Sequence, residues 1–166
     1  MAEEKVCGLP PLAAPQEGVK VWKGGCFCGA VTFEAHGDPL FRVQCHCTIC
    51  QRYQGADCIS VVAFNPDQLH VSCNGSATTK GFATSENMTR YRCSECGGPV
   101  YNQSPLEEMP FVDIPLSLFE RDEKERLLHL SELSPECHLF WHSRQDDLPA
   151  DLPKWASYPG VGEPLL

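Results

Sequence analysis

Seven of the eleven cysteines in this 166-residue chain fall into three short groups, and clustered thiols are well suited to hold a soft metal ion. The groups are Cys26-Phe27-Cys28, Cys45-His46-Cys47-Thr48-Ile49-Cys50 and Cys93-Ser94-Glu95-Cys96. Zinc binds thiolate sulfur in tetrahedral geometry, so four of these cysteines would complete one site. Three cysteines are then left over, and a metal ion with three protein ligands keeps one coordination position free for chemistry.

The first and third groups predict a closed, structural zinc site, which we call the four-thiol cluster. The spacing of Cys93 and Cys96 lets a tight turn present both sulfurs to one ion, and Gly97 gives the backbone freedom to reverse. Alternate residues of an extended segment share a face, so the sulfurs of the first pair point the same way. The predicted ligands are Cys26, Cys28, Cys93 and Cys96. No βαβ pattern surrounds the third group, which disfavours a thioredoxin-like redox dithiol.

The middle group predicts a second zinc site, the three-thiol cluster, with ligands Cys45, Cys47 and Cys50. Two alternatives would close this site and make it structural: Cys58 or His46 as a fourth ligand. His46 lies between two strand-like cysteines, so alternation points its ring the other way. An open site with three thiolates is a poor source of zinc hydroxide. It favours binding a substrate thiol as thiolate, which then adds to a small carbonyl, with solvent or His46 carrying protons.

Composition restricts the partners and the compartment. The formal net charge of −9 opposes binding to nucleic-acid phosphates. No run reaches the length of a membrane span, and the N-terminus lacks the basic and apolar parts of a signal peptide. We therefore expect a cytoplasmic protein with neither nucleic acid nor membrane as a partner. In a reducing compartment the clustered cysteines are metal ligands rather than disulfides. Cys7 is expected to be a free thiol, and Cys73 and Cys137 are expected to be small buried core residues.

Several arginines lie close in sequence to the cysteine groups and could form a local pocket for an anion. They are Arg42, Arg52, Arg90 and Arg92. We take Arg52 and Arg92 as candidate substrate-binding residues. The alternative, that these arginines offset thiolate charge or face solvent, remains open.

The elements that must position these residues are short and alternate between apolar and polar side chains. This period of two predicts strands at 19–22, 30–35, 41–44, 58–64, 69–73, 88–92, 99–101, 111–114 and 137–141. The length suits a single, mainly β domain over 19–166 that ends in an extended tail. Residues 1–18 read as a flexible leader, and the charged run 120–126 as a solvated loop.

The three ordered motifs resemble those of the glutathione-dependent formaldehyde-activating enzyme family, which includes centromere protein V. The resemblance spans about residues 20–160 and is carried by Gly25-Cys26-Phe27-Cys28-Gly29-Ala30-Val31, by Cys45-His46-Cys47-Thr48-Ile49-Cys50-Gln51-Arg52 and by Cys93-Ser94-Glu95-Cys96-Gly97. In this chain Gln51 stands where the family usually has an arginine, and Arg52 follows.

The resemblance implies a β-tent of small antiparallel sheets around two zinc sites per chain, with the ligands divided as above. It also implies carbon–sulfur lyase chemistry, in which glutathione and formaldehyde combine to S-hydroxymethylglutathione. Two alternatives fit the same cysteines: a non-catalytic glutathione carrier or protein-interaction module, and a lyase or isomerase that acts on another thiol adduct. The second would show metal-dependent turnover without a response to formaldehyde.

Overall fold

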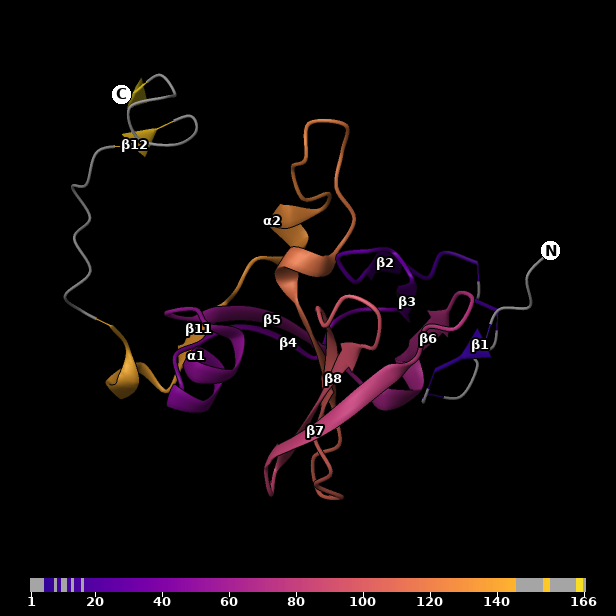
Figure 1. The fold of residues 1–166 in the computed structure, drawn as a ribbon, viewed down its shortest axis with the longest axis horizontal. Helices are drawn as coiled ribbons and strands as arrows, with labels where there is room; N and C mark the ends of the chain where they lie inside the picture. The colour runs from indigo at the N-terminus through magenta and orange to yellow at the C-terminus, as the bar shows by residue number, and fades with distance from the viewer. Residues whose placement is uncertain are drawn as a thin grey trace.

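The chain folds into two packed β-sheets (Figure 1). This computed structural model describes residues 5–7, 9, 12, 14–15, 17–145, 154–155 and 164–165. The four-stranded sheet has the order β1 (Lys5–Val6), β6 (Leu69–Cys73), β3 (Val31–His36) and β2 (Val21–Gly25). The seven-stranded sheet has the order β11 (Cys137–Leu139), β4 (Phe41–Cys45), β5 (Ile59–Phe64), β10 (Val112–Pro115), β9 (Pro99–Gln103), β8 (Met88–Cys93) and β7 (Thr79–Ser85).

Pairing in both sheets is antiparallel, except that β11 lies parallel to β4. A further short ladder joins β12 (Lys154–Trp155) to β13 (Pro164–Leu165). The helices are α1 (Thr48–Gln54), α2 (Leu130–Leu133) and the 3-10 turns η1 (Pro66–Gln68), η2 (Leu116–Leu118) and η3 (Trp141–Ser143). None of the helices in the described ranges has the length and apolar content needed to cross a membrane.

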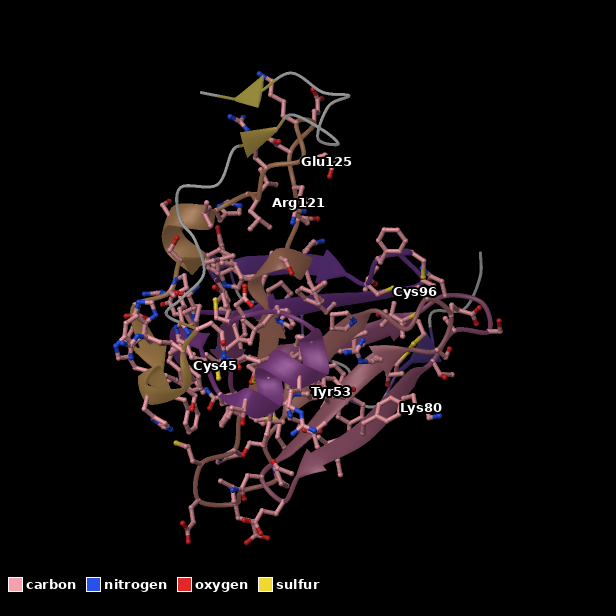
Figure 2. The ribbon with its side chains drawn as sticks, turned by 60° about the vertical axis from the view of Figure 1, so that its left-hand side comes forward. Cys45, Tyr53, Lys80, Cys96, Arg121 and Glu125 are labelled. Atoms are coloured by element: carbon pink, nitrogen blue, oxygen red, sulfur yellow. A yellow bond between two sulfur atoms is a disulfide. The ribbon has the colours of Figure 1, made fainter. Side chains whose placement is uncertain are left out.

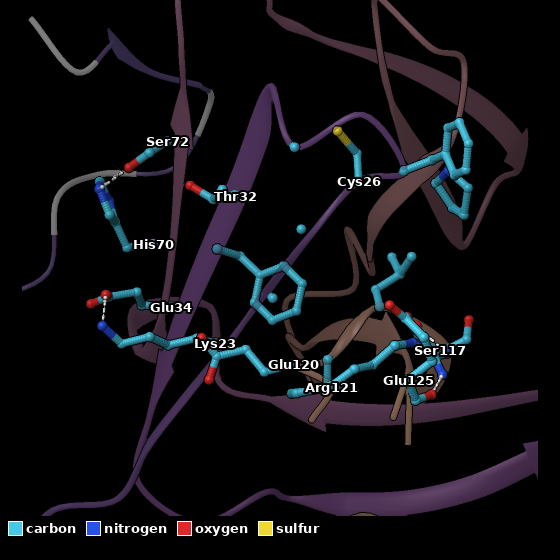
Figure 3. A pocket seen from close by; sticks show the side chains of 18 residues that line it. Lys23, Cys26, Thr32, Glu34, His70, Ser72, Ser117, Glu120, Arg121 and Glu125 are labelled. Atoms are coloured by element: carbon cyan, nitrogen blue, oxygen red, sulfur yellow. Dashed lines mark hydrogen bonds and ion pairs between the residues drawn. The ribbon is translucent and has the colours of Figure 1, made fainter. Parts of the chain in front are cut away.

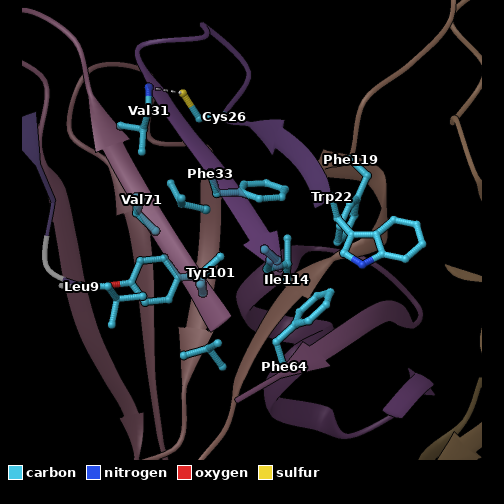
Figure 4. Close-up of a cluster of buried hydrophobic side chains, with 14 of the residues drawn as sticks. Leu9, Trp22, Cys26, Val31, Phe33, Phe64, Val71, Tyr101, Ile114 and Phe119 are labelled. Carbon is cyan, nitrogen blue, oxygen red and sulfur yellow. Dashed lines mark hydrogen bonds between the residues drawn. The ribbon is translucent and has the colours of Figure 1, made fainter. Parts of the chain in front are cut away.

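The hydrophobic core lies between the inner faces of the two sheets (Figure 4). Strand β3 alternates strictly, burying Val31, Phe33 and Ala35 while its other side chains face outward. Phe33 meets Phe119 edge-to-face at 5.3 Å between ring centroids, a geometry favoured by the ring quadrupoles. The core therefore holds the two sheets, and the cysteine groups attached to them, in fixed relative positions.

The outer face of the seven-stranded sheet is polar near its centre and carries α1. On β5, Val62 and Phe64 belong to the core, so Ala63 points outward. Asp113 lies opposite Ala63 in the register of β10 with β5, and thus shares the outer face. Side chains on this face contact α1: Arg90 and Arg92 on β8 donate hydrogen bonds to helix residues. Figure 1 places α1 beside β4 and β5.

The predicted mainly β architecture is confirmed, and the predicted strands match the observed ones to within a few residues. Several elements were missed, among them the short β1 and α2, and two of them, α1 and β7, lie beside the cysteine groups. Residues 48–54 form α1, because the Cys47 side chain caps the helix by accepting from Cys50 N–H at 3.3 Å and Gly55, with a φ of 65°, ends it. Strand β7 is polar and largely exposed at the sheet edge, so it carries no clear alternation.

The charged run 120–126 forms no helix, in agreement with the predicted loop. Arg126 pairs there with Asp122 at 2.6 Å.

The expectation of a free thiol at Cys7 is wrong. The structure joins Cys7 to Cys73 by a disulfide, with 5.9 Å between the Cα atoms. Strand β1 pairs with β6 and sets Lys5 opposite Cys73, and the Cys7 N–H donates to the Val71 carbonyl at 3.0 Å. A sequence separation of 66 residues hides this pairing from a reading of spacings.

The ends of the chain are described in part. The segment 1–18, predicted as a flexible leader, is attached to the body of the protein at residues 5–7, and Leu9 is buried. The predicted extended tail lies mostly outside the described residues.

Candidate metal centres

The four-thiol cluster brings together the two cysteine pairs that the sequence predicted. The four sulfurs lie within 4.8 Å of one another, with 3.6 Å between Cys26 and Cys28 and 3.9 Å between Cys28 and Cys93. The first pair follows β2 and the second begins at the end of β8. The cluster therefore connects the four-stranded sheet to the seven-stranded sheet.

Local backbone geometry explains how each pair turns its sulfurs inward. Gly29 and Gly97 have φ angles of 74° and 69°, in the left-handed region that glycine adopts at little cost. The Gly98 N–H donates to the Cys96 sulfur at 3.4 Å. Although desolvation opposes the shift, backbone hydrogen bonds from Gly98 and Cys28 lower the pKa of Cys96 to about 6. Four soft donors prepared in this way fit a tetrahedral zinc ion.

The three-thiol cluster forms where β4 ends and α1 begins. Its sulfurs also lie within 4.8 Å of one another, and 3.7 Å separates Cys45 from Cys50. Cys45 is buried, whereas Cys47 and Cys50 are half-buried. A hydrogen bond with Cys50 lowers the pKa of Cys45, and the same contact raises the pKa of Cys50. Three soft sulfur donors held this close together fit a zinc ion.

Neither alternative fourth ligand joins the three-thiol cluster. Among the residues that the structure describes, no other cysteine, histidine or carboxylate completes the group. The His46 ring lies 3.0 Å from a His138 nitrogen and packs edge-on against Trp141. Cys58 accepts a hydrogen bond from the Gln44 side chain at 3.0 Å. Because Gln44 precedes Cys45 on β4, it faces the opposite side of the sheet.

Arg52 and Arg92 take different positions around α1. Arg52 is exposed on the helix. Arg92, on β8, stacks on the Tyr53 ring at 4.4 Å and donates to the Tyr53 hydroxyl at 3.0 Å. It also donates to the Gly97 carbonyl at 2.8 Å. Arg92 thus joins the end of α1 to the turn of the four-thiol cluster, and substrate binding by either arginine stays a prediction.

Sequence reasoning missed a polar row on the outer face of the seven-stranded sheet, formed by Arg90, Asn102 and Asp113. All three residues are buried. Arg90 donates from Nη2 to the Cys50 sulfur at 3.2 Å. A signal was present in the sequence, since Asp113 interrupts the otherwise apolar stretch 111–114. Figure 2 shows α1, with Tyr53, between Cys45 and the β7–β8 side of the molecule.

A cavity of about 830 Å³ opens on the four-stranded sheet (Figure 3). Its lining includes Cys26 but no residue of the three-thiol cluster. The cations in its lining already have partners: Lys23 pairs with Glu34 at 2.8 Å, and Arg121 donates to the Glu125 carbonyl at 2.7 Å. The cavity therefore does not provide the open metal position that the sequence predicts.

A sequence model of the family described as "Glutathione-dependent formaldehyde-activating enzyme" matches residues 21–143. A search of curated proteins found no match. Among solved structures, the chain is similar to the crystal structure of a Rhodobacter sphaeroides protein from a structural genomics programme. The two share 20% identity, the match covers 70% of this chain and 99% of that one, and the TM-score is 0.48.

Proposed function

Because the chain belongs to the family of glutathione-dependent formaldehyde-activating enzymes, we propose that it is a zinc-dependent carbon–sulfur lyase. It would form or cleave the adduct between a thiol such as glutathione and a small carbonyl such as formaldehyde. The observation that carries the proposal is the three-thiol cluster, whose sulfurs lie together without a fourth protein ligand in the described part of the chain. The four-thiol cluster would then serve stability.

A zinc ion held by Cys45, Cys47 and Cys50 would supply a position where the substrate sulfur binds as a thiolate. The protein's part is to fix this position: the rigid end of β4 carries one sulfur, and the first turn of α1 carries the other two. Cys47 and Cys50 are only partly buried, which would let a small molecule approach the cluster from solvent.

The reaction itself is a simple addition. The thiolate sulfur donates an electron pair to the carbonyl carbon, the carbon–sulfur bond forms as the C=O π bond breaks, and the oxygen takes up a proton. The reverse reaction releases the thiolate and the carbonyl. The His46 ring is hydrogen-bonded to His138 and lies outside the thiol group, so we propose that water carries the proton.

Exchange spectroscopy by NMR tests the proposal on the zinc-loaded protein with glutathione and formaldehyde. We expect interconversion of formaldehyde and S-hydroxymethylglutathione to be faster than in buffer, and Cys50→Ser to remove the acceleration. Cys137→Ser provides the matched control. The expectation that Cys137 is buried is wrong: it lies exposed on β11, outside both clusters. Binding of glutathione without any acceleration would replace the lyase with a carrier function.

A further inference from the structure

Arg90 is a buried cation that contacts one sulfur of the three-thiol cluster. It is only 5% exposed, and burial of a charge is costly unless the charge is paired. Its Nη2 donates to the Cys50 sulfur at 3.2 Å, and its Nη1 is hydrogen-bonded to the Thr84 hydroxyl. The guanidinium carbon also lies 5.5 Å from the centre of the Tyr53 ring.

The sheet register fixes what lies behind this cation. Arg90 on β8 is directly opposite Asn102 on β9, and Asn102 is directly opposite Asp113 on β10. The Asn102 side chain donates to the Asp113 carboxylate at 2.5 Å. The three residues therefore form one row across three strands, with a cation at the end next to Cys50 and an acid at the far end.

Charge counting shows why the cation matters. A zinc ion with three thiolates carries one net negative charge, and a fourth thiolate raises this to two. A buried site resists such a build-up unless a positive group lies close. In the described part of the chain, Arg90 is the guanidinium that hydrogen-bonds a sulfur of the three-thiol cluster.

We propose that Arg90 is the positioning residue that lets the three-thiol cluster accept an anionic fourth ligand, and so selects a thiolate over a neutral ligand. This inference rests on the proposed function, because it takes a thiolate as the fourth ligand. Arg90 does not touch the substrate in this proposal; it acts through Cys50. Asp113, at the far end of the row, weakens the effect of Arg90, since a negative charge there reduces the positive potential at the cluster.

Cobalt(II) substitution gives a direct measurement. The visible ligand-field spectrum of cobalt changes when a fourth ligand binds, and the four-thiol cluster offers no position for one. The fully cobalt-loaded protein is titrated at neutral pH with 2-mercaptoethanol, which binds as a thiolate, and separately with imidazole, which binds as a neutral molecule. The ratio of the two dissociation constants measures the selectivity.

For Arg90→Met we expect 2-mercaptoethanol binding to weaken about tenfold or more, the size of effect that groups bonded to metal ligands have on metal affinity, while imidazole binding stays nearly unchanged. Arg90→Lys keeps the charge and should restore most of the thiolate affinity. Asp113→Asn, nearly identical in shape, should shift thiolate affinity in the opposite direction, towards tighter binding. Arg126→Met is the matched control, because this exposed arginine pairs with Asp122 away from the cluster.

The outcomes separate this inference from the proposed function. The inference would be overturned if Arg90→Met weakened the binding of 2-mercaptoethanol and imidazole equally. It would also be overturned if Asp113→Asn lost thiolate affinity, because the row would then have only a structural role. An unchanged thiolate affinity in Arg90→Met would also overturn it, while leaving the proposed function intact. Failure of the wild-type protein to bind 2-mercaptoethanol would remove the proposed function itself, and the inference with it.

Discussion

Cys50 makes contacts both within the three-thiol cluster and with the residues around it. Its sulfur meets Cys45 at 3.7 Å and receives the Arg90 hydrogen bond, while its backbone N–H donates to the Cys47 sulfur. Cys50 thus contacts a strand and a buried cation through its side chain and the helix cap through its backbone.

Replacement of Cys50 by serine should remove one of two bound zinc ions. Hydroxyl oxygen is a much weaker zinc ligand than thiolate, so we expect metal analysis to give one ion per chain instead of two. Cys58→Ser, at a half-buried cysteine bonded to Gln44, should retain both. Two ions in Cys50→Ser would contradict the assignment of this residue as a ligand.

Asp113 should make stability depend on pH with a definite sign. Burial raises its pKa from 3.8 to about 6, against the opposing effects of Asn102 and Arg90. Because the folded-state pKa is the higher one, stability is complete below 3.8 and falls as pH rises through 6. Asp113→Asn removes this dependence, so its stability relative to wild type should rise by about 1 kcal/mol from pH 5 to pH 7. Denaturant unfolding at both pH values measures the change, and a constant difference would refute it.

The residues of both clusters could be identified from the sequence because the cysteine spacing is local. Asp113, which interrupts the apolar stretch 111–114, is a sequence signal for the polar row itself, but the contact of that row with the cluster could not be predicted. The contact of Arg90 with Cys50 depends on the register of β8 with its neighbours and on α1 crossing that face, and neither is encoded in nearby residues. Proximity in sequence had left open whether these arginines bind substrate or offset thiolate charge, and the Arg90–Cys50 hydrogen bond supports the second role for Arg90.

At the scale of elements, α1 is held at both ends by side chains rather than by a buried apolar face. The helix buries none of its residues. Near its start, the Gln51 side chain donates to the carbonyls of His46 and Ser143, each at 2.9 Å. At its end, Arg92 donates to the Tyr53 carbonyl at 2.9 Å.

Gln51→Ala should therefore loosen α1 and η3 together. The change removes these two hydrogen bonds and the one that the Gln51 side-chain oxygen accepts from Gln145 at 3.2 Å. Their loss costs about 2–3 kcal/mol in the free energy of unfolding, and amide hydrogen exchange in residues 141–143 should become faster. Gln54→Ala serves as the control, since the Gln54 side chain accepts only a 3.4 Å contact from Arg92 among the described hydrogen bonds. Unchanged exchange in η3 would show that Gln51 does not hold the two elements together.

Alternation predicted most of the strands, because each buries one face against the core. The helix α1 gave no such signal. Three of the residues at 45–50 are cysteines whose positions serve a cluster, and the helix cap is a thiol rather than the usual serine or aspartate. Strand β7 was missed because it is an exposed edge strand, which buries too little surface to need an apolar face.

At the scale of the molecule, the four-thiol cluster ties the two sheets together, because one cysteine pair lies between β2 and β3 of the four-stranded sheet and the other at the turn from β8 to β9 of the seven-stranded sheet. Cys96→Ser should consequently destabilise the fold by more than about 4 kcal/mol, the range associated with loss of a metal site. Cys50→Ser should cost less, because its cluster lies within one sheet and its helix. Thermal unfolding followed by circular dichroism compares the two, and equal losses would contradict separate structural and functional roles.

Strand β8 reaches both clusters within four residues. Arg90 contacts a sulfur of one cluster, Cys93 belongs to the other, and Arg92 between them donates to Gly97 and to the end of α1. When zinc binding orders one end of this short segment, the other end becomes more ordered too. Uptake of the two zinc ions should thus be cooperative, and by thermodynamic reciprocity each ion would raise the affinity for the other by the same factor.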